Sequence, residues 1–233
     1  MSRERRLDRF AHLPAMDPHL ETLPDTQRSL WPRLDGVPED FVLYGGTALA
    51  LHLGHRSSVH FDFFSARPFA PTELLASLRW LGEVTVIDAA PNTLSFSTTD
   101  AVTLSFFGGM AIQVVAEQGL VHENGLVIAS VFDLAGTKAK ALLDRSEWKD
   151  YVDLATLLRA GHRPVDIIGY ATTVFEPMFE FPAAAFLRSL AFFEDGTAPD
   201  VPRDMQRELE AAVAQAWSET IPVVEPYAGS IAP

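Results

Sequence analysis

The sequence lacks cysteine, has no long apolar run and contains few basic residues. Without cysteine the chain forms neither disulfide bonds nor thiolate-ligated zinc sites, which fits a reducing compartment. No apolar run approaches the roughly 20 residues of a membrane span, and the opening MSRERRLDRF is too charged for the apolar core of a secretory signal. These absences predict a soluble, cytoplasmic protein that does not enter a membrane.

Basic residues are outnumbered: 18 Lys and Arg face 31 Asp and Glu, a formal net charge of −13. A charge of this sign repels polyanions, so any contact with nucleic acid has to rely on a local basic patch. Broad, nonspecific DNA binding is therefore not expected. The hydrophobic content of 48% and the charged content of 21% are ordinary for a globular protein with a proper core.

Hydrophobic periodicity changes along the chain from period 2 to period 3.6 near Ser130. We therefore predict an α+β fold, in which a mixed sheet flanked by helices is followed by a C-terminal helical bundle. The expected domains are a sheet domain over residues 1–130 and a helical domain over residues 131–233 with an irregular tail. The expected strands are FVLYGG, the segment from Val59 to Phe64, EVTVID, NTLSFST, AVTLSFF and GLVIAS.

A double glycine, Gly45-Gly46, separates the first predicted strand from a short apolar helix that ends at Gly54. Glycines let backbone N–H groups approach a phosphate, and the positive end of the helix dipole points into the same space. Thr47 can cap the helix and reach a phosphate oxygen. The alternative is a tight turn that binds nothing, because the motif is short.

The next predicted strand carries two polar residues on one face. Val59, Phe61 and Phe63 alternate with His60 and Asp62, so the last two side chains point the same way. Two ligands beyond a phosphate-binding turn can hold Mg²⁺ against a nucleoside triphosphate, which predicts that Gly45 and Asp62 lie within about 15 Å of each other. The alternative is a strand with one solvated face.

These motifs resemble the AbiEii/AbiGii-type nucleotidyltransferases, toxins of abortive-infection and toxin–antitoxin systems within the polymerase-beta-like nucleotidyltransferase superfamily. The likeness is carried by GGTALAL, LGHR, Ser58 and the strand HFDFF, and by the later segment DLAGTKAKALLDRSEWKDYVDL. It implies a nucleoside triphosphate substrate, an RNA acceptor (often a tRNA end) or a protein acceptor, and a cognate antitoxin. Gly45, Gly46, Thr47, Arg56 and Ser58 are the expected nucleotide-binding residues.

The chain departs from the family pattern at His60, where the first of two metal-binding aspartates is expected and only Asp62 is kept. A carboxylate with an imidazole clamps Mg²⁺ less well than two carboxylates do, and imidazole prefers Mn²⁺ or another transition metal. The neighbouring predicted strand AVTLSFF has no acid inside it, although Asp100 stands at its start. The alternative to an enzyme is therefore a catalytically degenerate nucleotide- or partner-binding module.

In the first helix of the second half, Lys138 falls within an apolar stripe, so its ammonium either snorkels to water or turns inward to an anion such as a phosphate. The resemblance favours the phosphate. We expect Lys138→Met to keep the fold, because the stripe gains an apolar residue, and to weaken triphosphate binding, because the anion loses a positive partner. On the next helix, periodicity places Asp150 at the apolar face and Asp153 nearer the polar side. The resemblance puts both aspartates at the catalytic site with Asp62 and Lys138.

Overall fold

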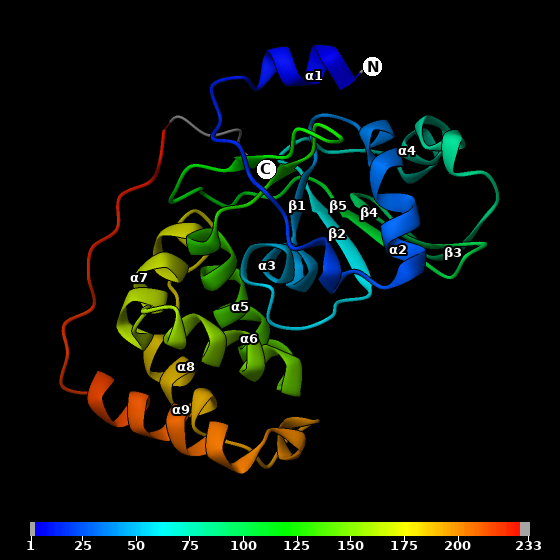
Figure 1. Ribbon diagram of the computed structural model, residues 1–233. Coiled ribbons are helices and arrows are strands. Elements are labelled where there is room, and N and C mark those ends of the chain that lie inside the picture. The colour runs from blue at the N-terminus through cyan, green and yellow to red at the C-terminus, as the bar shows by residue number, and fades with distance from the viewer. Residues whose placement is uncertain (1–2, 229–233) are drawn as a thin grey trace. The chain divides into compact units, whose positions relative to one another are not determined.

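The computed structural model describes residues 3–228 of the chain. The chain divides into two compact units. The described part of unit 1 comprises residues 3–112, residues 117–130 and residue 228, and unit 2 comprises Gln113–Ala116 and Val131–Tyr227. The fold is α+β, as the sequence predicts, because a sheet with several helices makes up unit 1 and helices make up most of unit 2 (Figure 1).

The strands in the described residues of unit 1 form a seven-stranded mixed sheet with the order β3-β4-β5-β2-β1-β7-β6. The pairs β5/β2 and β1/β7 are parallel, and the other neighbouring pairs are antiparallel. All six expected strands form, although the predicted segment from Val59 begins one residue later and GLVIAS contributes only two residues. The bounds are β1 Val42–Tyr44, β2 His60–Phe64, β3 Val84–Ala90, β4 Thr93–Thr98, β5 Thr103–Phe107, β6 Gly119–Leu120 and β7 Val127–Ile128.

One face of the sheet forms the core of unit 1. Phe63 stacks on Phe106 of the neighbouring strand with ring centroids 5.0 Å apart. Trp31, which begins the 3-10 helix before β1, stacks on Phe61. These side chains are almost fully buried. The helical elements of unit 1 are α1 Arg3–Arg9, η1 Leu20–Thr22, α2 Asp25–Leu30, η2 Trp31–Gly36, α3 Gly45–Leu53, α4 Pro71–Ser77 and η3 Arg79–Leu81.

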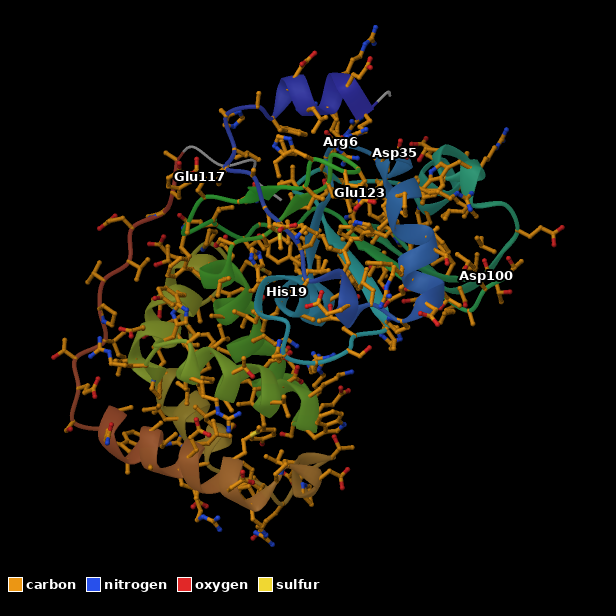
Figure 2. All side chains as sticks on the ribbon, in the orientation of Figure 1. Arg6, His19, Asp35, Asp100, Glu117 and Glu123 are labelled. Atoms are coloured by element: carbon orange, nitrogen blue, oxygen red, sulfur yellow. The ribbon has the colours of Figure 1, made fainter. Side chains whose placement is uncertain are left out.

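Two polar side chains fasten helices of unit 1 to loops beside the sheet. His52 of α3 lies with its Nε2 2.9 Å from the carbonyl of Ala129, just after β7. Arg6 of α1, labelled in Figure 2, donates to the carbonyls of Val37 and Pro38 ahead of β1. Burial lowers the pKa of Arg6 to about 10, against the opposing effect of nearby acids.

The described part of unit 2 consists mainly of five helices, followed by an irregular tail. Their bounds are α5 Val131–Arg145, α6 Trp148–Arg159, α7 Pro164–Phe175, α8 Ala183–Leu190 and α9 Arg203–Ala216, with η4 Ala198–Asp200 before the last (Figure 1). After α9 the tail packs against α7, where Thr173 Oγ1 donates to the carbonyl of Val224. No helix in residues 3–228 is long and apolar enough to cross a membrane.

The close approach of α5 and α7 in unit 2 depends on Gly136. A Cβ atom at this position would lie 3.1 Å from the backbone nitrogen of Ala171, so the two helices approach through the missing side chain. We predict that Gly136→Leu lowers the free energy of unfolding by at least about 2 kcal/mol, because a larger side chain has to push the two backbones apart. Urea unfolding measures the change.

Lys140→Leu is the matched control, since Lys140 lies one turn later on α5 and is partly exposed. It should change the free energy of unfolding by less than about 0.5 kcal/mol. Equal stability of the two variants would contradict the close packing of α5 on α7.

Candidate functional site

The double glycine begins α3 directly after β1. Gly45 is the first helical residue and has a φ of 74°, which favours glycine. A Cβ atom at Gly45 would overlap the Asp62 carboxylate, and one at Gly46 would lie 2.5 Å from Nη2 of Arg56. The two glycines therefore admit a carboxylate and a guanidinium to the N-terminus of the helix, where N–H groups have no intrahelical acceptor.

The strand register explains why Asp62 is so close. Strands β1 and β2 pair in an antiparallel manner with Tyr44 directly opposite Asp62. The helix begins at the residue after Tyr44, so its first turn has to lie beside the Asp62 side chain. The expectation that Gly45 and Asp62 are neighbours is therefore confirmed.

Thr47 and Ser58 tie the turn to β2. Thr47 is fully buried, and its Oγ1 donates to the carbonyl of His60 and lies 2.9 Å from Ser58 Oγ. The prediction that Thr47 caps the helix is wrong, because α3 starts two residues earlier and its N-cap is Tyr44. The hydroxyl is engaged by β2, so its first role is to hold the turn against the strand.

His60 and Asp62 share one face of β2, as the alternation predicts. His60 is exposed and Asp62 is half-buried, whereas Phe61 and Phe63 are fully buried on the other face. Val59 is not part of the apolar face, since it precedes the strand and is 56% exposed. An imidazole and a carboxylate thus lie together beside the turn.

A third metal-binding carboxylate could come from a strand next to β2, but serines occupy the positions beside Asp62. Ser105 of β5 pairs with Asp62, and its Oγ accepts a hydrogen bond of 2.8 Å from Ser95 of β4. Asp100 is exposed in the turn between β4 and β5, outside both strands (Figure 2). Strand β5, with the sequence TLSFF, therefore offers no acid beside Asp62.

A divalent metal ion needs more ligands than the protein alone supplies here. Among residues 3–228 no three or more His, Asp or Glu side chains are grouped so that they could hold a metal ion. Mg²⁺ in nucleotide sites is commonly held by one or two carboxylates together with substrate phosphates and water. Asp62 with His60 fits that mode, in which the triphosphate supplies further oxygen ligands, and does not fit an all-protein cage.

In unit 2, Lys138 lies between the two aspartates of α6. Its Nζ is 2.8 Å from Asp150 Oδ1 and 2.7 Å from Asp153 Oδ2. Lys138 is only 4% exposed and both aspartates are fully buried. The ammonium therefore does not snorkel to water, and the expectation that Asp153 faces the polar side is wrong, because the ion pair draws it inward.

Asp150 has a further partner, Arg145, which was not predicted from the sequence. Arg145 at the end of α5 donates to both oxygens of Asp150, from Nε to Oδ2 at 2.9 Å and from Nη2 to Oδ1 at 3.0 Å. Burial alone would raise the pKa of Asp150, but the hydrogen bonds from Arg145 and the charge of Lys138 outweigh it and hold this pKa below its usual value. The arginine five residues before Asp150 was the available signal.

The family described as "Nucleotidyl transferase AbiEii toxin, Type IV TA system" matches residues 31–228 of the chain. The chain belongs to the AbiEii family. It is thus a nucleotidyltransferase toxin of a toxin–antitoxin system, and this family implies both a nucleoside triphosphate substrate and an antitoxin. The match extends over the glycine turn and strand β2 of unit 1 and over the lysine–aspartate cluster of unit 2.

Individual relatives add little beyond the AbiEii family itself. An uncharacterized protein from Aquifex aeolicus (strain VF5) is 31% identical over 162 residues, which are 69% of this chain and 77% of that protein. A protein from H. pylori described as a nucleotidyltransferase has a TM-score of 0.49 at 16% identity, covering 82% of this chain and 91% of its own. MenT4, a nucleotidyltransferase toxin from Mycobacterium tuberculosis H37Rv, has a TM-score of 0.40 at 13% identity, covering 92% and 99%.

We predict that Gly45→Ala displaces Asp62 and abolishes binding of a metal–triphosphate complex. The added methyl group overlaps the carboxylate, and the left-handed backbone costs a further 1–2 kcal/mol, roughly. Gly54→Ala is the matched control, because Gly54 has a φ of 63° at the other end of α3. Calorimetric titration should show binding in Gly54→Ala and none in Gly45→Ala; equal affinities would contradict the assigned site.

Lys138→Met is predicted to destabilise unit 2 strongly, in contrast to the expectation from sequence. Removing the ammonium leaves two buried carboxylates with reduced compensation, which typically costs about 3–5 kcal/mol. Lys149→Met is the control, because Lys149 forms a partly exposed pair with Glu147 and should lose less than about 1 kcal/mol. If urea unfolding gave the two variants similar stabilities, the structural role of Lys138 would be refuted.

Proposed function

We propose that this chain transfers a nucleotide from a nucleoside triphosphate to a hydroxyl group of an RNA, such as a tRNA end, or of a protein. The acceptor oxygen would attack the α-phosphorus and form a phosphodiester bond, with loss of the hydroxyl proton and release of pyrophosphate. The observation that carries the proposal is the Asp62 carboxylate at the glycine-formed N-terminus of α3. A carboxylate and N–H donors that have no acceptor within the helix then flank the same small space.

The triphosphate would bind at the first turn of α3. The backbone N–H groups of Gly45 and Gly46 are not used within the helix, and the helix dipole favours an anion there. Arg56 adds a guanidinium against Gly46, and the hydroxyl of Ser58 lies beside it. A planar guanidinium suits phosphate oxygens, which it can bind through two N–H groups.

Asp62 and His60 would hold the divalent metal ion, Mg²⁺ or Mn²⁺. A bound ion supplies positive charge that stabilises the reacting phosphate and the leaving pyrophosphate. Asp62 provides the hard oxygen ligand, and His60 provides a nitrogen that Mn²⁺ accepts more readily than Mg²⁺ does. We therefore expect this protein to work better with Mn²⁺.

Lys138, Asp150 and Asp153 are proposed to be required for the reaction. The support is the resemblance of their segment to the AbiEii pattern, together with the burial of all three charged groups. Buried, mutually paired ionisable groups are frequent at functional sites, although they also occur in structural ion pairs. Lys138 is the proposed phosphate ligand of this cluster.

A second candidate is a nucleotide-binding or partner-binding module without turnover. It is favoured by His60 in place of an aspartate and by Ser105 opposite Asp62, because an active metal site commonly uses more carboxylates. Such a module would keep the glycine turn and Arg56, and would bind a triphosphate without transferring it.

Incubation with labelled nucleoside triphosphates and either total RNA or total protein separates the two candidates. An enzyme incorporates label into one of the acceptors, and we expect more incorporation with Mn²⁺ than with Mg²⁺. If no label enters either acceptor while triphosphate still binds, the module is the correct function. The Asp62→Asn variant reports the background.

His60→Asp should shift the metal preference towards Mg²⁺ and raise Mg²⁺-dependent transfer by about tenfold, since it adds a hard oxygen ligand and a negative charge. Val59→Asp is the matched control, because it adds the same charge at the neighbouring exposed position outside β2. Initial rates at equal Mg²⁺ and Mn²⁺ concentrations measure the shift. If His60→Asp and Val59→Asp had the same metal dependence, the pair would be a solvated strand face.

A further inference from the structure

Arg145 approaches the lysine–aspartate cluster from its partly exposed side. The side chain of Arg145 is 44% exposed, whereas the Asp150 side chain that it binds is fully buried. With two bonds from Arg145 and one from Lys138, the Asp150 carboxylate accepts three charge-assisted hydrogen bonds. A carboxylate bound in this way stays ionised despite its burial.

The charges show what Arg145 does for Lys138. Without the arginine, two buried carboxylates would share one ammonium, and the group would carry a net negative charge. Arg145 brings the group of four residues to neutrality. Since it binds both oxygens of Asp150, the ammonium of Lys138 shares only Oδ1 and keeps its shorter contact of 2.7 Å to Asp153.

Helix α5 before Arg145 and the packed turn after it together fix the position of its backbone. Lys138 and Arg145 are seven residues apart on α5, so they lie on one face of the helix. Ser146 then turns the chain with a φ of 45°. Gly196, from the segment after α8, packs so closely that a Cβ atom there would lie 2.8 Å from the Ser146 carbonyl oxygen, and Thr197 Oγ1 accepts from the Trp148 N–H.

We propose that Arg145 is a positioning residue for the reaction: it binds both oxygens of Asp150, so that the ammonium of Lys138 stays between the two aspartates and keeps its third N–H for an anionic substrate. This inference rests on the proposed function, in which Lys138 binds phosphate. Loss of Arg145 draws Lys138 onto Asp150, because that carboxylate is then its unshared partner. The lysine is retained, yet its ammonium is displaced towards Asp150.

The variants Arg145→Met and Arg145→Lys test the proposal. Arg159→Met is the matched control, since Arg159 binds Glu208 through the same Nε and Nη2 atoms on the exposed surface of the same unit. We expect Arg145→Met to raise the KM for the triphosphate about tenfold, and Arg145→Lys to recover part of that loss, because lysine keeps the charge but not the two-pronged geometry. Arg159→Met should stay within about twofold of the parent protein.

Thermal unfolding between pH 3 and pH 8 gives a readout that needs no transfer. The folded-state pKa of Asp150 lies below its usual value, so its stabilising contribution is present above the unfolded pKa of about 3.9 and is lost as the pH falls through the folded pKa. Arg145→Met removes donors that lower this pKa. The folded and unfolded pKa values of Asp150 then lie closer together, so the acid-dependent loss of stability should be smaller in Arg145→Met than in the parent protein or in Arg159→Met.

The outcomes are separable. If the parent protein transfers no nucleotide, the proposed function fails, and the acid dependence still decides whether Arg145 sets the ionisation of Asp150. An unchanged acid dependence overturns the positioning role even if activity falls, because Arg145 would then act directly or only through the fold. Arg145→Met with the KM of the parent protein overturns it as well, and Arg145→Lys carries the same test if the methionine variant does not fold.

Discussion

The contact between the Asp62 carboxylate and the glycine turn is the constraint on which unit 1 depends. It follows from strand pairing, because Tyr44 lies opposite Asp62 and α3 begins at the next residue. A side chain at Gly45 would displace the Asp62 carboxylate, and one at Gly46 would meet the Arg56 guanidinium. The positions of these two side chains therefore require both glycines. A helix N-terminus that is ready for an anion thus stands beside a ligand for a cation, which is the arrangement that a metal–triphosphate complex requires.

Unit 2 buries three charged side chains, those of Lys138, Asp150 and Asp153. Such a group is costly to bury unless each charge is matched and hydrogen-bonded. Lys138 bridges Asp150 and Asp153, and Arg145 completes the neutralisation at the end of α5. The cluster therefore links stability to ionisation, and a substitution made to probe function there also changes the fold's free energy.

Periodicity was sufficient for much of the fold. Alternation identified β2 to β5, and the change near Ser130 coincides with the start of α5. The two-residue strand β6 was not predicted, because Gly119 and Leu120 are not part of an alternating apolar segment. The pairing of Asp153 with Lys138 was not predicted either. Helix periodicity assigns polar residues to the exposed face and therefore misses a buried ion pair. Likewise, the sequence marked Thr47 as a cap, whereas its bond to the His60 carbonyl depends on strand packing.

Nucleotide-dependent metal binding tests the central claim most directly, because it examines the Asp62 site without requiring an acceptor. Electron paramagnetic resonance can follow free Mn²⁺ as the protein is added in the presence of a non-hydrolysable triphosphate analogue. Our account predicts that the parent protein withdraws Mn²⁺ only when the analogue is present, and that Asp62→Asn abolishes this effect. Equal triphosphate-dependent Mn²⁺ binding by the parent protein and Asp62→Asn would contradict it.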